Sequence, residues 1–211
     1  MRAPDVDLAR VAAAHRRCFA VVDRLTDEQV AAPSLLPGWS VGHVLNHLAR
    51  NADSHVRRTE AARSGQVVDQ YAGGMAGRGA EIDAGARRRA RELAGDVRRS
   101  ALAVEAAWRD LPDGMWVGRS RDANGQVRYL FELPARRWQE VEVHLLDLGA
   151  GAGVADWPDE FVAEWLPRTR ERVWPALGSG DYPAFATPAE ELAWLYGRLR
   201  RDDVPAPPAW G

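Results

Sequence analysis

The sequence predicts a mainly α protein, a four-helix bundle with an inserted β-hairpin and a short C-terminal helical extension. Apolar residues recur at helical spacing over four long segments. The pair Asn124-Gly125, between two short apolar runs, favours a hairpin turn. The glycine-rich segment 149–153 indicates a boundary between two regions. We therefore expect a bundle domain over residues 1–152 and a separate C-terminal region over residues 153–211.

The first two helices are predicted from their apolar spacing and from one capping residue. Apolar side chains follow a helical period over residues 5–31. Ser40 is a suitable N-cap for a second helix, which we expect to run to about Arg63. At 100° per residue, His47 lies on one edge of the apolar stripe of this second helix, whereas His43 lies further from it.

A third helix and the hairpin are expected in the middle of the chain. The apolar spine of the third helix continues over about residues 78–110. The segments 116–117 and 127–131 then flank Asn124-Gly125, the pair that best fits a type I′ turn. We read this part as a β-hairpin inserted before the last helix of the bundle.

The fourth helix of the bundle has a recognisable start and end. Pro134 is acceptable in its first turn, and Gly149 is a natural residue to terminate it. Glu140 and His144 are four residues apart within this helix, so their side chains share one face.

The C-terminal region has weaker signals. Residues 159–173 are compatible with a helix interrupted by Pro167. Thr187 begins a capping-box pattern, which predicts a helix to about Arg200. Residues 204–210 are rich in proline and are expected to form an extended tail.

Composition excludes several classes of protein. The 28 basic and 30 acidic residues give a net charge of −2, so no general field attracts nucleic acid or an anionic membrane. The single cysteine, Cys18, excludes a disulfide framework and a cysteine-based zinc site, and its apolar surroundings predict an inert packing residue. The N-terminus has no signal-peptide pattern and no run is long enough for a membrane span, so we expect a cytoplasmic protein.

A metal site is the sharpest chemical prediction. The Glu140 and His144 pair can point at one object, and His47 from a facing helix would complete a His-Glu-His set. This set suits zinc and leaves a fourth position for a water or a thiol. His43 is an alternative ligand one turn before His47, and His55 is interpreted as a core histidine.

Four segments together resemble the mycothiol-dependent maleylpyruvate isomerase family, which belongs to the DinB-like superfamily of metal-binding four-helix bundles. The resemblance is specific over roughly residues 5–150 and thin afterwards. The segments are LPGWSVGHVLNHLARNAD at residues 36–53, RGAEIDAGA at 78–86, RWQEVEVHLLDLG at 137–149 and LAWLYGR at 192–198.

The resemblance implies a site and a chemistry. His47, Glu140 and His144 match the family's ligands for Zn²⁺ or another divalent metal, and Arg78 matches a catalytic arginine. Mycothiol is the implied thiol cosubstrate, and its metal-activated thiolate would convert maleylpyruvate to the trans isomer by addition, rotation and elimination. Family members usually carry a longer C-terminal domain, so residues 153–211 are expected to be a shortened version.

Other interpretations remain open at this stage. The same thiolate could be transferred to an electrophilic small molecule, which would make the protein a mycothiol S-transferase. A non-catalytic metal-binding stress module would bind metal without affinity for a thiol. Arg78 could instead form a surface ion pair with Glu81 or Asp83. The metal, the substrate, the thiol and the choice between monomer and homodimer are not determined by the sequence.

Overall fold

The computed structural model describes residues 2–173, 175, 182–200 and 202–203. The chain divides into two compact units, residues 1–150 and 151–211. The structure is mainly helical, with one small antiparallel sheet, as the sequence predicts.

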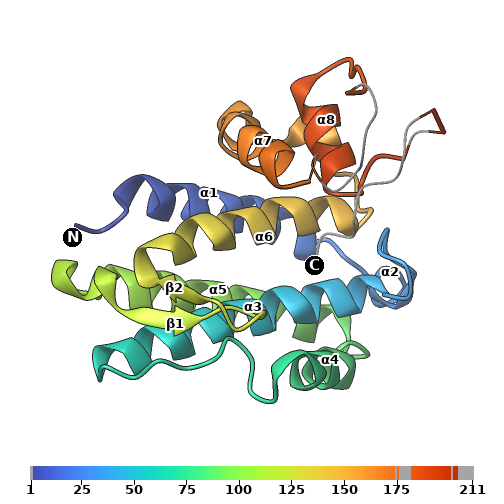
Figure 1. Ribbon diagram of the computed structural model, residues 1–211. Coiled ribbons are helices and arrows are strands. Elements are labelled where there is room, and N and C mark those ends of the chain that lie inside the picture. Colours follow the sequence, from blue (N-terminus) through green and yellow to red (C-terminus); the bar gives the residue numbers. More distant parts are fainter. Residues whose placement is uncertain (1, 174, 176–181, 201, 204–211) are drawn as a thin grey trace. The chain divides into compact units, whose positions relative to one another are not determined.

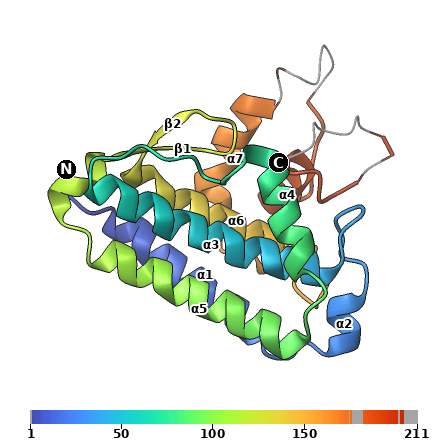
Figure 2. The same ribbon diagram turned by 90° about the horizontal axis from the view of Figure 1, so that it is seen from below.

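Four long helices form the body of the first unit, and they run side by side in Figure 2. They are α1 (Asp5–Val22), α3 (Val41–Arg63), α5 (Ala90–Arg109) and α6 (Leu133–Asp147). Helices α1 and α3 each pack against both α5 and α6, so α1 and α3 lie across the bundle from each other. The predicted four-helix bundle is therefore confirmed. Its core includes Leu45, Leu48, Leu93, Val97, Val104, Trp108, Trp138 and Val141, all nearly inaccessible to solvent.

The first predicted helix is in fact two helices. Helix α1 ends at Val22, and a short α2 (Asp27–Ala31) follows. Thr26 accepts a hydrogen bond from the Gln29 amide, and the Gln29 side chain accepts one from the Thr26 amide. This capping box begins a new helix, so the prediction of a single helix over residues 5–31 was wrong.

The third predicted helix is also divided, into α4 (Gly74–Gly85) and α5. A Cβ on Gly85 would lie 2.4 Å from Asn46 Nδ2, so this position tolerates only glycine without rearrangement. The Asp27 carboxylate accepts a hydrogen bond from the Ala90 amide at 2.8 Å and starts α5. The apolar period continues across the break, which is why one helix over residues 78–110 was predicted.

Helices α3 and α6 begin and end as predicted. The Ser40 hydroxyl accepts a hydrogen bond from the His43 amide, and His43 Nδ1 accepts one from the Ser40 amide. Pro134 lies in the first turn of α6, and Gly149 follows that helix with a φ of 62°. These two helices carry the three predicted metal ligands.

The hairpin is present but differs in its turn. Strands β1 (Arg119–Arg121) and β2 (Val127–Tyr129) pair antiparallel, whereas residues 116–117 belong to a 3₁₀ turn, η1 (Asp113–Val117). No described residue other than glycine has a positive φ, so Asn124 cannot form the predicted type I′ turn. The Asp122 carboxylate instead accepts hydrogen bonds from the amides of Asn124 and Gln126.

The second unit contains η3 (Val154–Asp156), α7 (Asp159–Val173) and α8 (Pro188–Leu195). Pro167 lies inside α7 without dividing it. The Thr187 hydroxyl caps α8 as predicted, but that helix ends at Leu195 rather than near Arg200. Residues 204–210, the expected tail, lie outside the described residues. Val173, Trp194 and Leu195 form a small core.

Candidate metal centre

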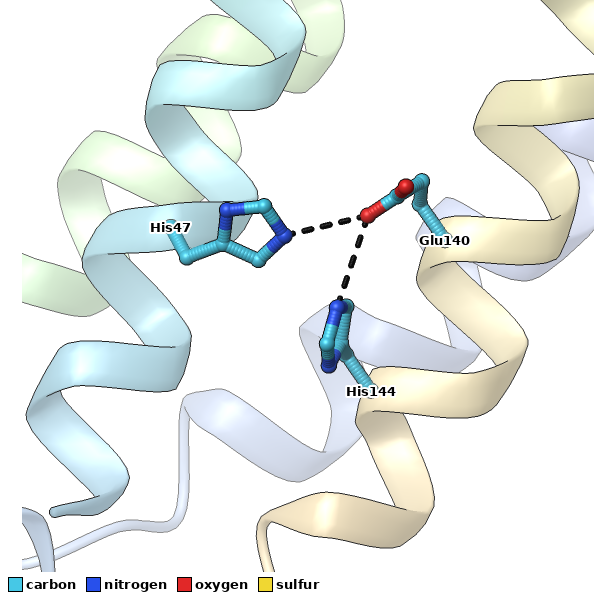
Figure 3. Close-up of side chains that lie close together, drawn as sticks. All are labelled: His47, Glu140 and His144. Carbon is cyan, nitrogen blue, oxygen red and sulfur yellow. Dashed lines mark hydrogen bonds and ion pairs between the residues drawn. The ribbon is translucent and has the colours of Figure 1, made fainter. Parts of the chain in front are cut away.

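Three side chains from two facing helices converge in the first unit. His47 projects from α3, and Glu140 and His144 project from successive turns of α6 (Figure 3). Glu140 Oε2 lies 3.0 Å from His47 Nε2 and 3.4 Å from His144 Nε2. One potential ligand atom from each residue lies within 4.8 Å of the other two.

These separations are close to what a zinc ion requires. For zinc–ligand bonds of about 2.0–2.1 Å, tetrahedral geometry places ligand atoms about 3.3–3.4 Å apart. The two Glu140 distances, 3.0 and 3.4 Å, bracket that value. Two imidazoles and one carboxylate form a donor set typical of catalytic zinc, which keeps a further position for water or substrate. The residues therefore fit a divalent metal.

The pKa values of the three side chains shift in different directions. Burial alone would raise the pKa of Glu140, but hydrogen bonds from His144 and His47 hold that pKa well below its usual value. Burial lowers the pKa of His47 to about 4, although the hydrogen bond to Glu140 opposes this shift. Hydrogen bonds to Asp147 and Glu140 outweigh burial and raise the pKa of His144. At neutral pH, an anionic Glu140 thus faces a neutral His47.

Asp147 orients His144 by a contact with Nδ1, the ring nitrogen that faces away from the cluster. Its carboxylate accepts a hydrogen bond from His144 Nδ1 at 2.8 Å, and its side chain is almost fully buried. The proton on Nδ1 leaves the lone pair of His144 Nε2 directed at the cluster once His144 is neutral. Carboxylate–histidine pairs of this kind are common behind metal ligands, because they fix the ring and raise its basicity. The His144-x-x-Asp147 spacing is the sequence signal that identifies Asp147 as a partner of this ligand.

Arg78, which belongs to α4, lies beside the cluster. Its Nη2 contacts His47 Nδ1 at 3.3 Å, and its guanidinium lies 5.7 Å from the ring centres of both Trp39 and Tyr71. Among the residues that the structure describes, no carboxylate lies within ion-pair distance of Arg78, so the alternative pairing with Glu81 or Asp83 is not formed. The four residues predicted to act together therefore do lie together.

Tyr71 is a neighbour of the cluster that could not be predicted from the sequence. It precedes α4 in a loop, has 3% of its surface exposed, and its hydroxyl accepts a hydrogen bond from Gln70 Nε2 at 3.3 Å. Burial raises the pKa of Tyr71, so it remains a neutral phenol. No period or motif marks an isolated loop tyrosine, and only the folded chain brings it to the centre.

A second arginine is buried beneath the centre. Arg137 donates hydrogen bonds to the Leu48 carbonyl, to Asn51 Oδ1 and to His15 Nε2. His15 in turn donates from Nδ1 to Glu105 at 2.7 Å. No described carboxylate pairs directly with Arg137, so its charge is balanced by neutral acceptors and by the more distant Glu140.

The remaining candidates lie away from the centre. His43 contacts Ser40 through Nδ1, and its Nε2 lies 3.7 Å from Asp83, so it is not in the ligand cluster. His55 is buried against Trp108, as expected of a core histidine. Burial raises the pKa of Cys18 to about 12, which makes it unreactive as a thiolate.

Comparisons with known proteins agree with this architecture. A family model described as the mycothiol maleylpyruvate isomerase N-terminal domain matches residues 11–149. A crystal structure of a mycothiol-dependent maleylpyruvate isomerase matches with a TM-score of 0.88 and 22% identity, covering 98% of this chain and 97% of that one. A crystal structure of a mutant of the mycothiol-dependent enzyme gives a TM-score of 0.87, with the same identity and coverage. No curated protein matches by sequence.

The coverage bears on the C-terminal region. The matched share, 98% of this chain and 97% of the solved one, extends beyond the segment that the family model matches. At 22% identity, this likeness concerns the fold.

Proposed function

Because the chain belongs to an enzyme family, that of the mycothiol maleylpyruvate isomerase N-terminal domain, we propose that it is a metal- and thiol-dependent isomerase. Its substrate would be maleylpyruvate or a closely related cis-configured keto acid, and mycothiol its thiol cosubstrate. The observation that carries this proposal is the convergence of His47, Glu140 and His144 at metal-ligand distances.

The side chains of such a site would have separate roles in binding the metal and in orienting its ligands. His47, Glu140 and His144 would hold Zn²⁺ or another divalent ion from two facing helices. A metal bound there would supply the one property that these side chains lack, because it deprotonates a coordinating thiol at neutral pH. Asp147 would keep the ring of His144 in the tautomer that leaves Nε2 free.

Arg78 is placed to bind the anionic part of the substrate. It is half-buried, it lies next to His47, and it has no carboxylate partner among the described residues. Its guanidinium can therefore donate charge-assisted hydrogen bonds to a carboxylate or to the enolate oxygen that develops during addition. Stabilising that charge would favour thiol addition, rotation about the resulting single bond, and elimination to the trans product.

The protein itself offers no thiol for this chemistry. Cys18 is its one cysteine, it is buried on α1, and its pKa is raised to about 12. The nucleophilic sulfur must therefore be supplied by a cosubstrate, which supports thiol dependence.

The test is product analysis by mass spectrometry. Zinc-loaded protein would be offered mycothiol with maleylpyruvate, and in parallel mycothiol with a generic electrophile. The proposal expects fumarylpyruvate with the thiol returned unchanged. A stable thiol conjugate as the only product would replace it with the S-transferase alternative. Bound zinc without either product would favour a specialised substrate or a non-catalytic metal module.

Removal of one ligand should abolish both metal binding and turnover. His47→Ala leaves two ligands, so zinc content and isomerisation should both fall by at least about a hundredfold. His43→Gln is the matched control on the same helix, because glutamine preserves the capping box with Ser40. An active, metal-free His47→Ala protein, or equal losses in both variants, would contradict the proposed site.

A further inference from the structure

Both ring nitrogens of His47 have partners, and the partners fix the tautomer. Arg78 Nη2 can only donate, so His47 Nδ1 accepts its hydrogen bond at 3.3 Å. A neutral imidazole carries a single N–H, which must then be at Nε2 and is donated to Glu140 Oε2 at 3.0 Å. In the metal-free protein, His47 is therefore protonated on Nε2.

A metal ion requires the opposite arrangement. Nε2 is the atom of His47 that faces Glu140 and His144, so it is the atom that would coordinate (Figure 3). A neutral ring that coordinates through Nε2 carries its proton on Nδ1. The Nδ1–H of His47 and the N–H of Arg78 would then be two donors facing each other, and their hydrogen bond could not persist.

His144 provides an internal comparison. Its Nδ1 contacts Asp147, which is an acceptor, so Nδ1 carries a proton both with and without metal. His144 thus keeps its outer hydrogen bond when Nε2 coordinates. Only His47 has a donor behind it, and metal binding therefore acts on Arg78 through His47 alone.

From this asymmetry we propose that metal loading releases Arg78 from His47, and that Trp39 and Tyr71 act as positioning residues that keep the freed guanidinium beside the metal, available to a carboxylate of the substrate. The inference rests on the proposed function, because it deepens the role of the same site. If metal binding releases Arg78, this residue binds a substrate carboxylate more tightly in the metal-loaded protein than in the metal-free protein.

The contacts that would retain Arg78 are already formed. Its guanidinium lies 5.7 Å from the ring centre of Trp39 and 5.7 Å from that of Tyr71, and cation–π attraction favours this position. The Tyr71 hydroxyl is close enough to the guanidinium for Arg78 to act on the pKa of this phenol, opposing the rise caused by burial. Neither contact involves His47 Nδ1, so both can survive metal binding.

The first test is the zinc affinity of the metal-free protein, measured by competition with a chromophoric chelator. Zinc must displace the Arg78 hydrogen bond in the wild type but not in Arg78→Met, so the variant should bind zinc about fivefold more tightly. Arg50→Met is the control, because Arg50 is on α3, the helix that carries His47, but pairs with Asp53 and Asp96. It should stay within about twofold of the wild type. Equal affinities for wild type and Arg78→Met, or equal gains in both variants, would overturn the release.

The second test observes the proton directly. Long-range ¹⁵N–¹H spectra should show His47 protonated on Nε2 without zinc and on Nδ1 with zinc, while His144 keeps its proton on Nδ1 in both. If the wild type takes up no zinc, the proposed function fails together with the inference. If it takes up zinc with an unchanged His47 tautomer or an intact Arg78–His47 contact, only the inference fails.

The positioning role has a kinetic signature. Tyr71→Phe removes the hydroxyl and keeps the ring, so zinc affinity should stay within about twofold while the KM for maleylpyruvate rises about fivefold. A merely structural tyrosine would lower zinc content or stability instead. An unchanged KM at full zinc loading would overturn the assignment of Tyr71.

Discussion

At the scale of single residues, the candidate centre depends on what lies behind each ligand. Asp147 is the clearest case, because its buried carboxylate accepts the Nδ1 proton of His144. Asp147→Leu should weaken zinc binding about ten- to a hundredfold, since an unsupported ring loses both orientation and basicity. Asp147→Asn keeps a hydrogen-bond acceptor, so its zinc affinity should lie between those of the wild type and Asp147→Leu. Competition titration measures this order, and a Leu variant with wild-type affinity would show that Asp147 does not support the centre.

His15 makes stability depend on pH. Burial lowers its pKa to about 4, although the hydrogen bond to Glu105 opposes the shift, and the usual value is 6.5. Below pH 6.5, the unfolded chain binds a proton at His15 that the folded chain does not. The stabilisation is therefore complete above pH 6.5 and is lost as the pH falls towards 4.

The corresponding variant is His15→Gln, which cannot take up that proton. Between pH 7 and pH 5, the unfolding free energy of the wild type should fall by about 2 kcal/mol more than that of the variant. Urea denaturation at the two pH values measures the difference. The comparison uses each protein as its own reference, so a constant loss from the missing Arg137 contact cancels. Equal falls would contradict the assignment.

At the scale of elements, Gly42 shows how closely the helices approach. A Cβ at this position of α3 would lie 2.1 Å from the Ala86 carbonyl, in the connection between α4 and α5. Because that neighbour is backbone, Gly42→Ala should destabilise the protein by about 1–3 kcal/mol. Gly79→Ala, in α4 with nothing within 4 Å of its Cβ, is the control. It should be neutral or slightly stabilising, and a neutral Gly42→Ala in thermal denaturation would contradict the close contact.

Helix positions were predictable where a cap and an apolar period agreed, as in α3 and α6. The breaks at residues 23–26 and 86–89 were missed because the apolar period runs through them. At the first break, a capping box at Thr26 starts a new helix. At the second, Asn46, which comes from a distant part of the chain, donates hydrogen bonds to the carbonyls of Glu81 and Ile82 near the end of α4. The hairpin was found from its glycine, but its turn is determined by the Asp122 carboxylate.

The candidate site divides in the same way. The Glu140 and His144 pair follows from helical spacing, and His47 was proposed as the third ligand from its place on a facing helix. The family resemblance agreed with these three residues and added Arg78. Tyr71 was not predictable, because its position depends on how a loop returns to the bundle. The opposite tautomers of the two histidines could not be inferred either, since they depend on atomic contacts.

At the scale of the whole molecule, the proposed chemistry belongs to the first unit. His47, Arg78, Glu140 and His144 all lie within residues 1–150 and within the segment matched by the family model. The net charge of −2 gives no long-range attraction for polyanions. Within the described residues, no helix combines the length and the apolar character needed to cross a membrane.

The central claim is that His47, Glu140 and His144 hold a metal that binds an external thiol. Zinc K-edge X-ray absorption, recorded on the zinc-loaded protein before and after addition of mycothiol, tests it directly. We predict only nitrogen and oxygen neighbours at first, and one new sulfur at about 2.3 Å after addition. Buried Cys18 cannot supply that sulfur. A spectrum that mycothiol leaves unchanged would contradict the claim.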